Sequence, residues 1–87
     1  MDIIKLRDKL TRLSPQVRNQ ILSDTIAWLE AEERPKCKPD HLHHLVNFEN
    51  ELQGLLNQSK LQEQWFVQVA QTYGSFPFYE RFVRKVL

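Results

Sequence analysis

Apolar residues recur every three or four positions along almost the whole chain, and this period limits the fold more than any other feature. Ile3, Leu6, Leu10 and Leu13 form the first such series, and residues at this spacing share one side of an α-helix. The sequence has no alternating apolar runs bounded by hairpin turns, which would indicate strands. It also has only two glycines, a residue type common in such turns. The pattern therefore predicts an all-α protein.

Proline residues divide this pattern into segments. Ser14 can cap a helix that begins at Pro15, because its hydroxyl can accept a hydrogen bond from a free backbone N–H. Proline is tolerated at the first helical position because an N–H there would have no helical partner. Pro35 and Pro39 cannot lie inside a helix and should end the segment that begins at Pro15 near residue 33.

Two further signals divide the second half of the chain. Ser59 followed by Gln62 has the spacing of a capping box, so a helix should begin near Lys60. Gly74 is placed as a left-handed C-cap. Short turns favour antiparallel neighbours, so we expect a small antiparallel bundle of four to five helices, with five if Ser14-Pro15 breaks the first: up to Leu13, Pro15 to about Glu33, His41 to about Gln58, Lys60 to Tyr73, and Phe78 to Leu87.

The same spacing predicts which residues face the core. The second helix should bury its apolar stripe, with Trp28 at one edge, and the third should place Phe48 away from its main stripe. The predicted inner residues are Val17, Ile21, Leu22, Ile26, Leu29, Leu42, Leu45, Val46, Leu52, Leu55, Leu56, Leu61, Trp65, Phe66, Val69, Ala70 and Tyr73.

Composition narrows the class of protein. At 87 residues with 41% hydrophobic and 26% charged side chains, residues 1–87 should form a single folded helical domain. No apolar stretch is long enough for a membrane span, and the start of the chain does not resemble a signal peptide. A single cysteine excludes an internal disulfide. These features indicate a soluble cytoplasmic protein.

One segment offers metal-ligating side chains. Cys37, His41 and His44 lie within eight residues, and the two histidines are three positions apart, which suits one face of a helix. A structural zinc site usually draws its ligands from two separated pairs, and the chain has no second pair. We therefore expect no metal, no cofactor and no enzymatic activity, and keep metal binding by these three residues as an alternative.

Basic residues gather in two places. The first segment carries a basic group that faces two acidic residues, Asp2 and Asp8: Lys5, Arg7, Lys9, Arg12 and Arg18. The last segment carries Arg81, Arg84 and Lys85 against Glu80. A net charge of only +1 is low for a nucleic-acid-binding domain. Nucleic acid and membrane partners are therefore not expected, although a nucleic-acid-associated regulator using the basic first helix remains an alternative.

The aromatic residues are concentrated near the C-terminus. Seven of the nine lie between positions 65 and 82, and aromatic and arginine side chains are enriched at binding hot spots. Trp65, Phe66 and Phe82 are expected in the core. We predict a non-enzymatic interaction or regulatory module that docks a protein partner, or a second copy as a homodimer, through Tyr73, Phe76, Phe78, Tyr79, Arg81 and Arg84.

Overall fold

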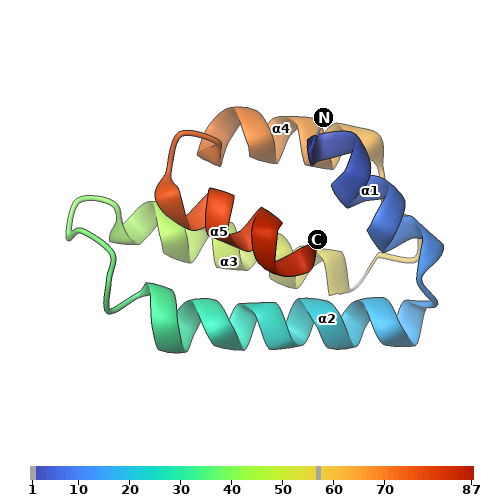
Figure 1. Ribbon diagram of the computed structural model, residues 1–87, viewed down its shortest axis with the longest axis horizontal. Helices are drawn as coiled ribbons and strands as arrows, with labels where there is room; N and C mark the ends of the chain where they lie inside the picture. The colour runs from blue at the N-terminus through green and yellow to red at the C-terminus, as the bar shows by residue number, and fades with distance from the viewer. Residues whose placement is uncertain (1, 57) are drawn as a thin grey trace.

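The structure is a computed structural model and describes residues 2–56 and 58–87. All regular secondary structure in these residues is helical. No strand is found in these residues, so the all-α prediction is confirmed. Five α-helices follow one another (Figure 1), and a π-helical turn, η1, extends the second: α1 (Asp2–Arg12), α2 (Pro15–Trp28), η1 (Leu29–Glu33), α3 (Leu42–Leu56), α4 (Glu63–Tyr73) and α5 (Pro77–Val86).

Ser14 separates α1 from α2 as its chemistry predicts. Its backbone is extended, with φ −62° and ψ 153°. Its hydroxyl accepts a hydrogen bond from the Val17 N–H at 3.3 Å, and Pro15 is the first helical residue. The break is therefore real, and the alternative with five helices is confirmed.

The helices pack around a shared core. α2 packs against α3 and α5, and α1 packs against α4 and α5. Figure 1 shows α2 along one side, α1 and α4 on the other, and α3 and α5 between them. The finer prediction of an antiparallel bundle stays a prediction.

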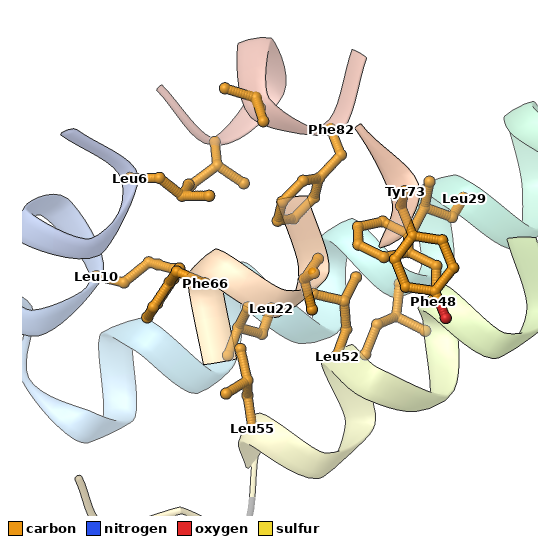
Figure 2. Close-up of a cluster of buried hydrophobic side chains, with 14 of the residues drawn as sticks. Leu6, Leu10, Leu22, Leu29, Phe48, Leu52, Leu55, Phe66, Tyr73 and Phe82 are labelled. Carbon is orange, nitrogen blue, oxygen red and sulfur yellow. The ribbon is translucent and has the colours of Figure 1, made fainter. Parts of the chain in front are cut away.

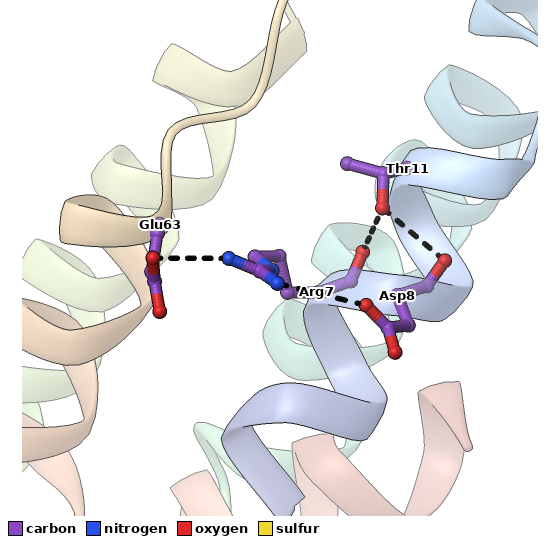
Figure 3. A network of polar contacts seen from close by, with 4 residues as sticks. All are labelled: Arg7, Asp8, Thr11 and Glu63. Atoms are coloured by element: carbon purple, nitrogen blue, oxygen red, sulfur yellow. Dashed lines mark hydrogen bonds and ion pairs between the residues drawn. The ribbon is translucent and has the colours of Figure 1, made fainter.

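Two polar contacts hold α1 in place. Arg7 Nη1 lies 3.1 Å from the Glu63 carboxylate at the start of α4, while a second guanidinium nitrogen lies 3.8 Å from Asp8 (Figure 3). The Lys9 ammonium donates to the Val86 carbonyl. Because that carbonyl lies at the negative end of α5, a lysine is favoured there.

Phe48 lies at the centre of the core, and its predicted position off the main stripe is wrong. The side chain is 0% exposed and faces Tyr73 and Phe82 (Figure 2). Rings from α4 and α5 approach this flank of α3 and cover it. Leu42, predicted to be inside, is 40% exposed instead.

The inner face of α2 differs from the prediction in its first turn. Leu22, Ile26 and Leu29 are buried as predicted, but Val17 is 48% exposed and Arg18 is buried in its place. The Arg18 Nη2 donates to the Gln58 carbonyl at 2.6 Å. This bond connects α2 to the segment before α4, and the buried arginine takes the inner position that was predicted for Val17.

The predicted start of α4 is wrong, whereas its predicted end at Tyr73 is confirmed. The helix begins at Glu63, and its cap residue, Gln62, makes no side-chain capping bond. Leu61 is only 5% exposed, so the extended segment before the helix is used to bury this side chain. At the other end, Gly74 is the C-cap as predicted, and its N–H donates to the Ala70 carbonyl. Its conformation is right-handed, with φ −60°, and the predicted left-handed conformation is wrong.

Candidate functional site

The four aromatic residues predicted to bind a partner separate into two groups. Tyr73 and Phe78 are 7% and 3% exposed and belong to the core, where both contact the Phe48 ring. Phe76 and Tyr79 are only partly buried. The aromatic cluster therefore supplies both core and surface, and only the second pair is in reach of a partner.

Phe76 joins the segment before α3 to the start of α5. Its ring lies edge-on to His41, with centroids 5.0 Å apart, and tilted to His44 at 4.7 Å. It also stacks on Phe78 at 5.2 Å. The two histidines therefore pack against an aromatic ring.

The structure does not assemble the residues considered for a metal. Among the described residues, no group of three histidine, cysteine or acidic side chains has an arrangement that could hold a metal ion. Cys37 is a free, partly buried thiol. Burial raises the pKa of Cys37 above its ordinary value, and the charges of Glu33 and Asp40 raise it further. The thiol is therefore protonated at neutral pH, the form that is a poor nucleophile.

Arg81 is held by a carboxylate that the sequence reasoning missed. Glu33 is 2% exposed, and the Arg81 Nε–H donates to its two oxygens at 2.8 and 2.9 Å. The Nη2 atom lies 2.6 Å from the same carboxylate. This hydrogen bond raises the pKa of Arg81. Glu33 lies four positions after the buried Leu29, on the same side of the helix, and this spacing is the signal that could have revealed it.

A second buried carboxylate lies nearby on α3. Glu49 is 3% exposed and binds Arg34 through two hydrogen bonds, that from Nε being 3.0 Å long. The bond to Glu49 raises the pKa of Arg34. Since Arg34 directly follows Glu33, the two ion pairs fix both η1 and the segment after it to neighbouring helices.

Arg84 has a different partner from Arg81, and Tyr79 lies on another side of α5. Arg84 is 75% exposed and pairs with Glu80 one turn earlier at 2.6 Å. Tyr79 and Arg81 are two positions apart on α5, so they project to nearly opposite sides of the helix. The six predicted partner-binding residues therefore do not form one continuous surface.

A small cavity opens beside the Arg81–Glu33 pair. Its volume is about 300 Å³, and it lies between the segment that follows η1 and the first turns of α5. Pro77 and Glu33 belong to its walls, together with Lys36, Cys37, Lys38, His41, Phe78 and Arg81. Of the residues predicted from the sequence, this cavity brings together Cys37, His41, Phe78 and Arg81.

A larger hollow of about 480 Å³ lies between α3 and the start of α4. Its lining includes Gln58, Gln62, Gln64 and Gln68, with Trp65 half-buried at its edge. Neutral amides dominate this surface, and the oppositely charged Glu51 and Lys60 both belong to it. The two opposite charges offset each other, so the hollow has no net charge that would select a partner.

The two basic segments of the sequence do meet, because α1 packs against α5. Lys5, Lys9 and Arg12 share one stripe of α1, and Lys9 reaches the end of α5. Arg7, Arg81 and Arg84 are each paired with a carboxylate, while Lys85 lies over the Trp28 ring at 5.1 Å. Much of the positive charge is therefore already engaged.

Comparison with protein-family models, with curated proteins and with solved structures finds no match to this chain. No helix within residues 2–56 and 58–87 is long and apolar enough to cross a membrane. The functional interpretation therefore depends on the geometry of the site.

Proposed function

We propose that this chain is a non-enzymatic binding module that docks a protein partner on one surface, here called the loop–α5 surface. It consists of residues 34–41, Phe76 and the outward side of α5 that carries Arg81. The proposal includes the antiparallel arrangement of the helices. We also propose that the protein is cytoplasmic, because a free thiol such as that of Cys37 stays reduced there.

The cavity beside Arg81 carries this proposal. Its walls come from two segments that are far apart in the sequence, and the buried Glu33 carboxylate joins them through Arg81. A site that is already shaped before binding loses less conformational entropy when a partner arrives. Arginine and aromatic side chains are also enriched at binding hot spots.

Phe76 supports the same surface from a second direction. The ring is partly buried against His41 and His44, so part of it stays available for contact. Together with Arg81, it gives the loop–α5 surface an apolar element beside a charged one. This combination is typical of the centre of a protein interface and its polar rim.

Blocking the surface with a bulky group tests the proposal. Cys37→Ser is combined with Lys38→Cys, and the new thiol is labelled with a bulky maleimide. The control carries the same label at Ser23→Cys, an exposed position on α2, again with Cys37→Ser. Unlabelled and labelled chains then capture partners from a cell extract, and retained proteins are quantified by mass spectrometry.

The expected result is loss of the same proteins when position 38 is labelled and their retention when position 23 is labelled. Equal capture by both labelled chains contradicts docking on the loop–α5 surface. Light scattering over a range of concentrations shows in parallel whether the partner is a second copy. Circular dichroism of each labelled chain verifies that it remains helical.

A further inference from the structure

We propose that the cavity of the loop–α5 surface binds a carboxylate side chain on an acidic peptide segment of the partner, with an apolar residue beside that carboxylate. This inference rests on the docking function proposed above and adds the chemistry of the partner. It follows from the charges on the cavity wall, the free donors of Arg81 and the apolar part of the lining.

The exposed charges on the cavity wall are all positive. Lys36 and Lys38 are exposed, and the Arg81 side chain is 45% exposed. Glu33, the carboxylate in the wall, is only 2% exposed and is covered by Arg81. A ligand entering the cavity therefore meets lysine and arginine nitrogens, which attract a carboxylate.

Arg81 lines the cavity and keeps N–H donors that Glu33 does not use. A guanidinium has five N–H groups in a fixed plane, and the contacts to Glu33 use Nε and Nη2. Both Nη1 N–H groups have no partner among the described residues. Because Glu33 fixes the plane of the guanidinium, these donors are positioned before a ligand binds.

Part of the cavity lining is uncharged. Pro77 and Phe78 supply apolar surface, and Cys37 supplies a thiol whose pKa is raised by burial. A volume of about 300 Å³ is at the small end of ligand cavities. It suits one or two side chains of a peptide better than a nucleotide, and the compact cluster of cations is unlike the extended stripe that follows a phosphate backbone.

Asp40 provides an internal test of this charge argument. It is 79% exposed, and its carboxylate lies 3.9 Å from His41 Nε2 on the cavity wall. An acidic ligand is repelled by Asp40 but attracted by Lys36 and Lys38. Removing the Asp40 charge should therefore strengthen binding, while reversing the lysine charges should weaken it.

The experiment measures fluorescence anisotropy with a labelled peptide of alternating glutamate and leucine, against the same peptide with glutamine in place of glutamate. The chains are the wild type, Lys36→Glu with Lys38→Glu, Asp40→Asn, and Lys60→Glu as a control in the larger hollow. We expect the glutamate peptide to bind at least about tenfold more tightly than the glutamine peptide. The double reversal should lose about tenfold or more, Asp40→Asn should gain about two- to threefold, and Lys60→Glu should change affinity less than about twofold.

Alkylation of the Cys37 thiol measures separately whether the peptide occupies the cavity. Bound glutamate peptide should slow alkylation of Cys37, which lines the cavity. Equal binding of both peptides, an unchanged affinity of the double reversal, or unprotected Cys37 overturns the inference. So does an oligonucleotide of equal charge that binds more tightly and displaces the peptide.

This result is distinguishable from failure of the docking function. If the label at position 38 removes partners but the glutamate peptide does not bind, the surface is right and the acidic chemistry is wrong. If the label has no effect on capture, the docking surface itself is wrong.

Discussion

Replacing Phe48 tests whether contacts between rings, rather than burial alone, hold the core together. Phe48 is 0% exposed and Phe66 is 2% exposed, so Phe→Leu removes a similar buried area at both positions. Their surroundings differ. Within residues 2–56 and 58–87, Phe66 has one aromatic neighbour, Trp65, at 4.9 Å. Phe48 has four in the same residues at 5.0 to 6.0 Å: Tyr73, Phe78, Tyr79 and Phe82.

Aromatic pairs contribute about 0.5 kcal/mol or more beyond their buried area. The three additional pairs at Phe48 should therefore make Phe48→Leu about 1.5 kcal/mol more destabilising than Phe66→Leu. For a domain of this size, that corresponds to a melting temperature about 6–12 °C lower. Thermal and urea unfolding followed by circular dichroism measure both variants. Losses that agree within about 0.5 kcal/mol would refute the role given to the ring contacts.

Three further predictions concern single positions. Arg81→Ala should destabilise by about 2–3 kcal/mol because it leaves a buried carboxylate unpaired, whereas Arg84→Ala, in an exposed pair, should cost less than about 0.5 kcal/mol in urea unfolding. Gly54→Ala should stabilise by about 0.5–1 kcal/mol because an added Cβ meets no atom within 4 Å. Gly74→Ala should instead destabilise by about 1–3 kcal/mol, since its Cβ would lie 2.3 Å from a backbone oxygen; a thermal melt compares the two. Burial raises the pKa of Tyr73 above its ordinary value of about 10, so the unfolded chain loses this proton first. Stability should hold below about pH 10 and fall above it, and the fall should be shallower in Tyr73→Phe when unfolding is measured across that range.

Local chemistry is enough to predict some helix boundaries. Ser14 and Pro15 begin α2 because a hydroxyl cap and a proline at the first position depend only on adjacent residues. The helix start predicted from the capping-box spacing at Ser59 is wrong although the spacing is correct. There, the bond from Arg18 to the Gln58 carbonyl and the burial of Leu61 determine the path of the chain, and such tertiary contacts are not encoded in local spacing.

The buried charges show a different limit of sequence reasoning. A periodic pattern of apolar residues does not by itself predict that a glutamate is buried, yet Glu33 and Glu49 both are. Each is buried because an arginine from another part of the chain reaches it, Arg81 from 48 positions away and Arg34 from 15. The spacing of the sequence shows that the two glutamates lie on the inner sides of their helices. Which arginine pairs with each glutamate depends on how the helices pack.

The same buried pair explains why Lys38 is a better probe of function than Arg81. Arg81 both neutralises Glu33 and lines the cavity, so its removal would weaken folding and binding together. Lys36 and Lys38 are exposed and make no side-chain hydrogen bond or ion pair among the described residues. Reversing both charges should change the free energy of unfolding by less than about 0.5 kcal/mol, even though it removes the attraction for an acidic ligand. Urea unfolding of this double variant checks the separation, and a loss above about 1 kcal/mol would mean that the lysines also stabilise the fold.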